Sequence, residues 1–249
     1  MKIGIQSNLW SDEVHRTDMP RLLSEIAQAG FDGIEIGYHR LEGFEQPESF
    51  LKMVQQEDLH VSGIHTLGKF YFDEDTDYLE RAAAFAQTVQ TRFVLVSGEQ
   101  GEKNQDELQV IADVLNKSGE ICQKAGLTYC YHNHWWEIQN DQNELRTICQ
   151  LTDPSLVSLC LDIGWVERSG NSVVQVVGDF IDRIRYFHLK DTRDERFVDL
   201  GEGTLDFPAW LNVIGDPSTF YLTHERDEVL PDALDSATRS RTYLRSLGL

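Results

Sequence analysis

The chain has 249 residues, with 22 Lys and Arg against 42 Asp and Glu, which gives a formal net charge of −20 at pH 7. A negative field of this size repels phosphate backbones and anionic lipid headgroups, so it argues against nucleic acid and membrane surfaces as partners. The start MKIGIQSNLW contains no signal-peptide apolar region, no later apolar run could span a bilayer, and the four cysteines form no CxxC pair. We therefore expect a cytoplasmic protein with reduced thiols.

Short β-rich runs alternate with segments of helical periodicity along the whole chain. In chain order, the predicted strands span 2–8, 33–37, 60–66, 92–98, 127–133, 157–165, 184–191 and 219–225. Helical periodicity is clearest over 19–29, 77–90 and 107–125. Eight such units without a linker predict a (β/α)8 TIM barrel that covers residues 1–249 as one domain. A doubly wound sheet would need fewer strands or an additional domain.

Polar and ionisable side chains gather at the predicted carboxyl ends of the strands, which is where a TIM barrel builds its active site. From the first strand to the eighth, they are Gln6, Ser7 and Asn8; Glu35; His65; Ser97 and Glu99; His132, Asn133, His134 and Glu137; Asp162; His188 and Lys190; and His224 and Glu225. Asp162, His188 and Glu225 each follow a mainly apolar run. Carboxylates and imidazoles that converge from neighbouring strands form a mixed oxygen and nitrogen site suited to Mn²⁺, Co²⁺, Zn²⁺ or Mg²⁺.

Each of these residues also has an ordinary structural explanation. A strand-end Asp often caps the next helix, a His is often a hydrogen-bonded wall residue, and a Glu often pairs with Arg or Lys. Their joint placement at the ends of consecutive strands favours a metal site over three separate structural roles.

The fifth strand runs into the stretch YCYHNHWWE, residues 129–137. Side chains alternate along a strand, so His132 should point into the barrel and is the better-placed metal ligand. Glu137 lies beyond the strand and could reach back to the metal or to a substrate hydroxyl. Trp135 and Trp136 could form a wall for a sugar ring or simply anchor the loop in the core.

The sequence resembles the xylose isomerase-like sugar phosphate isomerase/epimerase superfamily, which also includes inosose dehydratases, 3-dehydroshikimate dehydratases, ketose 3-epimerases and apurinic endonucleases. The resemblance rests on GIQSNLW, AGFDGIEIG, VSGIHT, AGLTYCYHNHWWEI, LDIGWVERSG, HLKD, LGEGTLDF and HERDE. It implies a TIM barrel with a divalent ion held by Glu, Asp, His and Glu from strands five to eight. Asp162, His188 and Glu225 match the last three ligands. The first falls on His132, with Glu137 the nearest carboxylate.

This resemblance implies a divalent-metal-dependent sugar or sugar phosphate isomerase or epimerase that acts through a metal-stabilised enediolate. The acid and base groups would come from Glu137, Glu225, His65 and His134. The residues expected to contact the substrate are Trp10, Glu35, Trp135, Trp165 and Lys190. Because the family's strand-five Glu is replaced by His132, a dehydratase of a keto-inositol or keto-sugar is the alternative.

Two further functions are weaker expectations. An apurinic endonuclease would need more metal ligands and a basic groove, and a non-catalytic sugar-binding barrel would tolerate loss of the ligands that this chain retains. The sequence leaves open whether the substrate is phosphorylated, because Lys190 and the turn with Gly201 and Gly203 could contact a phosphate. Homo-oligomerisation is compatible with the sequence.

Overall fold

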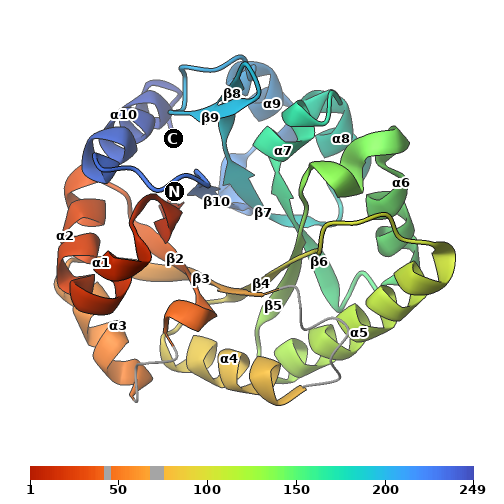
Figure 1. The fold of residues 1–249 in the computed structure, drawn as a ribbon, viewed down its shortest axis with the longest axis horizontal. Coiled ribbons are helices and arrows are strands. Elements are labelled where there is room, and N and C mark those ends of the chain that lie inside the picture. The colour runs from red at the N-terminus through yellow and green to blue at the C-terminus, as the bar shows by residue number, and fades with distance from the viewer. Residues whose placement is uncertain (42–45, 68–75) are drawn as a thin grey trace.

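The computed structural model describes residues 1–41, 46–67 and 76–249. Its centre is a closed barrel of parallel strands in the order β1-β10-β7-β6-β5-β4-β3-β2, seen along its axis in Figure 1. The strands are β1 (Ile3–Gln6), β2 (Gly33–Gly37), β3 (His60–Thr66), β4 (Phe93–Ser97), β5 (Thr128–His132), β6 (Val157–Asp162), β7 (Ile184–Leu189) and β10 (Tyr221–His224). The predicted (β/α)8 barrel is therefore confirmed, with each predicted strand run at its expected place in the chain.

Helices surround the barrel on its outside (Figure 1). They are α1 (Asp12–Thr17), α2 (Met19–Ala29), α3 (Pro47–Gln56), α4 (Thr76–Thr88), α5 (Gln105–Lys124), α6 (Trp135–Leu151), α7 (Ile163–Arg168), α8 (Val173–Phe180), α9 (Phe207–Ile214) and α10 (Ala233–Ser246). The three helices predicted from periodicity correspond to α2, α4 and α5. Within the described ranges, no helix combines the length and apolar character needed to cross a membrane.

Local sequence signals explain where these helices begin and end. Helix α2 begins after Asp18, whose side chain accepts a hydrogen bond from the Arg21 amide, and it ends at Gly30, whose φ of 87° is a left-handed conformation. Helix α5 begins with a capping box between Asn104 and Glu107.

The predicted ends of the sixth and seventh strands require correction. The sixth was expected to extend to 165, but β6 ends at Asp162, whose carboxylate accepts a hydrogen bond from the Trp165 amide at 3.0 Å and so starts α7. Trp165 consequently lies in a helical turn. The seventh was expected to extend to 191, but β7 ends at Leu189 and Asp191 begins a hairpin of β8 (Asp191–Arg193) and β9 (Arg196–Val198), which the sequence did not predict.

Alternation along the strands divides the core into two parts. Cys130 and Cys160 point into the barrel, where they form a small cluster with Phe93, Leu95 and Tyr186. Tyr129 and Tyr131, the alternate residues of β5, belong to the larger core between strands and helices. The predicted inward direction of Cys130 and His132 is thus confirmed, and all four cysteines are free thiols.

Candidate metal centre and active site

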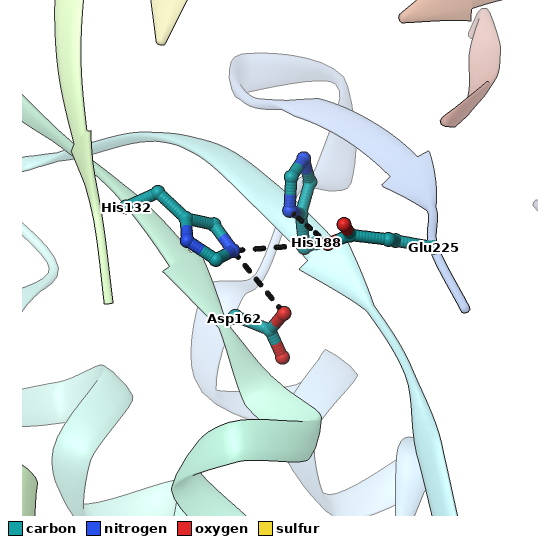
Figure 2. Close-up of side chains that lie close together, drawn as sticks. All are labelled: His132, Asp162, His188 and Glu225. Carbon is teal, nitrogen blue, oxygen red and sulfur yellow. Dashed lines mark hydrogen bonds and ion pairs between the residues drawn. The ribbon is translucent and has the colours of Figure 1, made fainter. Parts of the chain in front are cut away.

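Four side chains from consecutive strands of the barrel converge at its carboxyl end (Figure 2). They are His132 at the end of β5, Asp162 at the end of β6, His188 on β7 and Glu225 directly after β10, and each offers a ligand atom within 4.8 Å of the others. His132 Nε2 lies 3.3 Å from Asp162 Oδ2 and 3.7 Å from Glu225 Oε2, and His188 Nδ1 lies 2.6 Å from Glu225 Oε2. The structure thus brings together the residues expected as metal ligands.

The contacts inside this cluster fit a bound cation. His188 Nε2 lies 2.7 Å from Glu35 Oε2, and a carboxylate only accepts, so Nε2 carries a proton there. In the neutral ring, Nδ1 then presents a lone pair toward Glu225 Oε2 at 2.6 Å. Two facing acceptors repel each other, so this contact needs either a proton on Nδ1 or a cation between the two atoms. Two carboxylates and two imidazoles suit a divalent ion without any soft thiolate ligand.

The pKa shifts of the cluster residues show how positive charge nearby stabilises the carboxylates. Burial alone would raise the pKa of Glu225, but His188 and Lys190 hold that pKa well below its ordinary value. Burial alone would lower the pKa of His188, whereas Cys160, Glu225 and Glu35 raise it well above its ordinary value. Burial raises the pKa of Asp162, and the charge of Lys190 and the hydrogen bond from His132 lower it overall. The carboxylates are therefore ionised at neutral pH.

Lys190 lies against the cluster as its fully buried neighbour. Its Nζ is 2.9 Å from Asp162 Oδ2, 3.1 Å from Glu225 Oε2 and 2.8 Å from Asp227 Oδ2. Burial lowers the pKa of Lys190, but these carboxylates raise it overall, so the side chain stays charged. Lys190 was expected to contact the substrate. Its three ion pairs instead give it the role of holding the carboxylates in place.

A second group of side chains adjoins the cluster from β2, β3 and β4. His65 Nδ1 is 2.9 Å from Glu35 Oε1, His65 Nε2 is 2.8 Å from Ser97 Oγ, and Ser97 Oγ is 3.2 Å from His132 Nδ1. Glu35 is fully buried and both of its oxygens are bound to imidazoles. Burial alone would raise the pKa of Glu35, but His188 and then His65 lower it to about 2. Glu35, expected to contact substrate, is thus already fully paired.

A pocket of about 210 Å³ opens above the cluster. Three of the four residues expected to act as acids or bases, His65, His134 and Glu225, line it together with His132. Sequence reasoning did not single out Asn8 and Asp227, which also line it, although their signals were present in the polar end of the first strand and in HERDE. Asn8 Nδ2 donates to Glu225 Oε1 at 3.2 Å and so orients that carboxylate.

Glu137 does not join this group. It is fully buried at the start of α6, where its carboxylate accepts hydrogen bonds from the His134 backbone N–H at 2.8 Å and from the Tyr131 hydroxyl at 3.2 Å. The geometry therefore favours His132 over Glu137 as the first metal ligand.

The tryptophans expected to contact substrate have different surroundings. Trp10 is buried, donates from Nε1 to Glu25 at 2.6 Å, and lines a separate pocket beside α1, α2 and the segment 229–235. Trp135 and Trp165 belong to an aromatic group beside the mouth, in which His134 stacks on Trp136 with ring centroids 4.2 Å apart. Trp165 thus adjoins the pocket residue His134 directly and Trp135 adjoins it through Trp136, whereas Trp10 lines a different pocket.

The turn around Gly201 and Gly203, which the sequence offered as a phosphate cradle, is filled from within the chain. The Asp191 carboxylate accepts hydrogen bonds from the backbone N–H groups of Thr192, Gly201, Gly203 and Leu205 at 2.9 to 3.2 Å. A β-carbon on Gly203 would lie 2.0 Å from Asp191 Oδ1, so glycine is required for this close approach. These amides are occupied by a side-chain anion and are not free for a ligand.

Comparison with known proteins identifies relatives over nearly the whole chain. The model of the family described as xylose isomerase-like TIM barrel matches residues 23–247. An inosose dehydratase of Clostridium perfringens is 24% identical over 298 residues, covering 98% of this chain and 97% of the relative. An inosose dehydratase of Mesomycoplasma hyopneumoniae is 28% identical over 233 residues, covering 83% of this chain and 75% of the relative.

Solved structures share the fold at low sequence identity. A sugar phosphate isomerase/epimerase from Parabacteroides distasonis superposes with a TM-score of 0.82 at 21% identity, covering 98% of this chain and 93% of the other. An L-ribulose 3-epimerase gives 0.79 at 21% identity, with 100% and 95% covered. The IOLI protein, solved with a bound zinc atom, gives 0.75 at 14% identity, with 99% and 98% covered.

Proposed function

The chain belongs to the xylose isomerase-like TIM barrel family, and from this premise we propose that it is a divalent-metal-dependent dehydratase of a small keto-sugar or keto-inositol. The observation that carries the proposal is the composition of the mouth. His132 occupies the first ligand position. Glu137 caps helix α6. The imidazoles of other residues face the pocket beside Glu225. Inosose dehydratases among the relatives support the same reaction class.

The metal would be held by His132, Asp162, His188 and Glu225, whose donor atoms suit Mn²⁺, Co²⁺ or Zn²⁺. When bound, such an ion acts as a Lewis acid that polarises a carbonyl oxygen and makes the neighbouring C–H more acidic. The chain itself keeps both carboxylates ionised through Lys190 and the imidazoles, and Asn8 fixes the second oxygen of Glu225 at the pocket wall.

Two groups in the pocket can move the protons that an elimination requires. The Glu225 carboxylate is the base for the proton next to the carbonyl. His134 in its protonated form can donate a ring N–H proton to the departing β-hydroxyl, which leaves as water while the C=C bond forms, and the ring returns to the neutral form that burial favours by lowering its pKa. His132 lies beside both residues, at 3.7 Å from Glu225 and with its ring centroid 4.9 Å from that of His134, so base and acid both adjoin the same imidazole.

Epimerisation remains a second candidate because an L-ribulose 3-epimerase shares the fold over the whole chain. It would require two bases on opposite faces of one substrate carbon. The glutamate nearest to the family's first base position, Glu137, is buried in hydrogen bonds with the His134 amide and the Tyr131 hydroxyl. The remaining arrangement of one carboxylate with imidazoles supports elimination better.

We also propose that the substrate is not phosphorylated. Among the described residues that line the pocket none is Lys or Arg. Lys190 is neutralised by carboxylates, and the Gly201 and Gly203 amides are bound to Asp191. The pocket volume of about 210 Å³ is below the ~300 Å³ typical of the smallest sites for drug-sized ligands, which suits a single sugar ring.

The proposal is tested by loading the protein with Mn²⁺, Co²⁺ or Zn²⁺ and incubating it in D₂O with keto-inositols, ketoses and their phosphate esters. We expect a product lighter by one water from an unphosphorylated ketone, detected by mass spectrometry and NMR. His134→Gln should reduce kcat by about 10²–10⁴-fold while retaining metal, and Asp162→Ala should lose both metal and activity.

An isomeric product of unchanged mass, with deuterium at the reacting carbon, would replace the dehydratase with the epimerase. A preference for phosphate esters would contradict the unphosphorylated substrate. Absence of a bound ion in the wild-type protein, with no product from any ketone, would leave a sugar-binding barrel as the better description.

A further inference from the structure

A closed circuit of polar contacts runs around the barrel mouth through both imidazole ligands. It passes from Glu35 through His65, Ser97 and His132 to Glu225, and returns through His188 to Glu35, with each step between 2.6 and 3.7 Å. Glu35 is its origin because it is a fully buried carboxylate with no other role in the site described above. Both of its oxygens are used. Oε2 begins a short branch through His188. Oε1 begins a long branch through His65, Ser97 and His132.

The short branch determines which nitrogen of His188 faces the cluster. Glu35 Oε2 can only accept, so His188 Nε2 donates to it at 2.7 Å. In the neutral ring Nδ1 then carries the lone pair, and Nδ1 is the atom that faces Glu225 Oε2. Figure 2 shows the His188 ring directed at Glu225 from β7. A carboxylate behind a ligand imidazole fixes its tautomer and orientation in many metal sites.

The long branch determines the tautomer of His132 in the same way. His65 Nδ1 donates to Glu35 Oε1, so its Nε2 accepts from the Ser97 hydroxyl at 2.8 Å. Because the Ser97 hydroxyl donates its only proton to His65, Ser97 Oγ accepts a hydrogen bond from His132 Nδ1 at 3.2 Å. In the neutral ring, His132 Nε2 is then left with its lone pair toward Asp162 and Glu225, the two carboxylates that would share an ion with it.

We propose that Glu35 is a positioning residue that fixes the tautomers of both imidazole ligands, His188 directly and His132 through His65 and Ser97. This inference rests on the proposed metal-dependent function, because the two lone pairs matter only if an ion binds between them. It gives Glu35 and Ser97 a function in metal binding although neither is within the four-residue ligand set.

The same residues permit one other interpretation. Glu35, His65 and His188 also lie close enough to hold an ion of their own. Their contacts of 2.7 and 2.9 Å are those of hydrogen bonds, and each Glu35 oxygen already has an imidazole donor. Since His188 also belongs to the first cluster, the hydrogen-bonded interpretation accounts for both oxygens of Glu35 and for the two imidazole nitrogens that face them.

The test is a titration of the metal-free protein with Co²⁺ and with Zn²⁺, followed by calorimetry and by the visible spectrum of bound Co²⁺. The variants are Glu35→Gln, Ser97→Ala and Ser97→Thr. The control is Glu144→Gln, which removes a carboxylate paired with Lys103 at 2.8 Å outside the circuit. Circular dichroism and thermal unfolding establish that each variant folds.

We expect one ion per wild-type chain and an affinity about 10–100-fold weaker for Glu35→Gln, because the amide N–H₂ needs an acceptor and forces one ring to reverse its tautomer. Ser97→Ala should weaken binding less, since it frees His132 alone, and Ser97→Thr should restore it. The Co²⁺ spectrum should change in Glu35→Gln and stay unchanged in Glu144→Gln.

Three results would overturn the inference. Wild-type affinity and spectrum in both Glu35→Gln and Ser97→Ala, with binding lost in Asp162→Ala, would refute the role of Glu35 and leave the proposed function standing. Two ions per wild-type chain would favour the second metal site. No ion in the wild-type protein would remove the proposed function and this inference together. Ser97→Ala keeps the test decisive if Glu35→Gln does not fold.

Discussion

The three residues of the HNH stretch, 132–134, each have different surroundings. His132 faces the ligand cluster, and His134 lines the pocket. Asn133, between them, accepts from the Asp162 backbone N–H at 2.9 Å and approaches the Asp162 carbonyl with its amide at 3.3 Å. The middle residue therefore ties the end of β5 to the end of β6. Only His132 belongs to β5, whereas Asn133 and His134 lie between this strand and α6.

His15 provides a test of electrostatics at the scale of one residue, away from the metal cluster. It is buried, with Nδ1 2.8 Å from the Ser11 carbonyl and Nε2 3.0 Å from Ser7 Oγ. Burial, with a smaller effect from Arg40, lowers the pKa of His15 from 6.5 to about 4. Because the folded pKa is below the unfolded one, its contribution to stability is complete above pH 6.5 and is lost as the pH falls through about 4.

We therefore expect the free energy of unfolding of the wild type to fall more steeply between pH 6.5 and pH 4 than that of His15→Gln, whose side chain does not titrate. Urea unfolding of both proteins at several pH values measures this difference. Parallel curves would show that His15 protonates equally in the folded and unfolded states.

At the scale of elements, periodicity and punctuation were sufficient for the barrel. The runs at 33–37 and 60–66 coincide with β2 and β3, and the periodic segment 19–29 coincides with α2. Helix capping was one explanation that the sequence offered for a strand-end Asp such as Asp162, but the predicted strand extended to 165 because the apolar surroundings continue to Trp165. The β8–β9 hairpin was not predicted because its strands are only three residues long and depend on contacts of Asp191 with residues distant in sequence.

The candidate site could likewise be predicted only in part. The convergence of the expected ligands could be predicted because each follows an apolar strand run, and a TIM barrel brings such positions together. The roles of Glu35 and Glu137 could not, because they depend on which hydrogen-bond donors lie nearby after folding. The sequence places a carboxylate near a mouth, whereas the structure determines whether its lone pairs are free.

Asp191 is the residue on which the hairpin and the following turn depend. Its buried carboxylate accepts the backbone N–H groups of Thr192, Gly201, Gly203 and Leu205. Asp191→Ala leaves these donors without an acceptor and should destabilise the protein by about 2–4 kcal/mol. Denaturant unfolding compares it with Asp194→Asn, which alters a carboxylate of the same hairpin and should change stability little. Equal effects would show that the turn holds its conformation without Asp191.

At the scale of the whole molecule, the ligand cluster joins strands that are far apart in sequence. Its residues come from β5, β6, β7 and the end of β10, so an ion bound to all four links much of the barrel. An ion that binds the folded state alone, at about 100 times its Kd, stabilises it by about 2.7 kcal/mol. For a chain of this size we expect the Tm to rise by about 5–10 °C.

Thermal unfolding with EDTA and with excess Co²⁺ or Zn²⁺ measures this shift. Asp162→Ala should show none, whereas His134→Gln, which leaves the ligands intact, should shift like the wild type. A similar shift in all three proteins would mean that the ion binds elsewhere on this acidic molecule.

The imidazole at position 132 has a consequence for formal charge. With His132 and His188 neutral, the ligand set carries two negative charges, from Asp162 and Glu225, and these balance a divalent ion. The adjoining Lys190 and Asp227 cancel each other, so the four ligands with their ion are electroneutral. The buried Glu35 carboxylate behind His188 adds one negative charge outside the ligand set, and a further carboxylate in place of His132 would have added a second to a low-dielectric interior. The centre thus suits borderline ions that accept nitrogen ligands better than Mg²⁺, and offers an uncharged ketone neither attraction nor repulsion at long range.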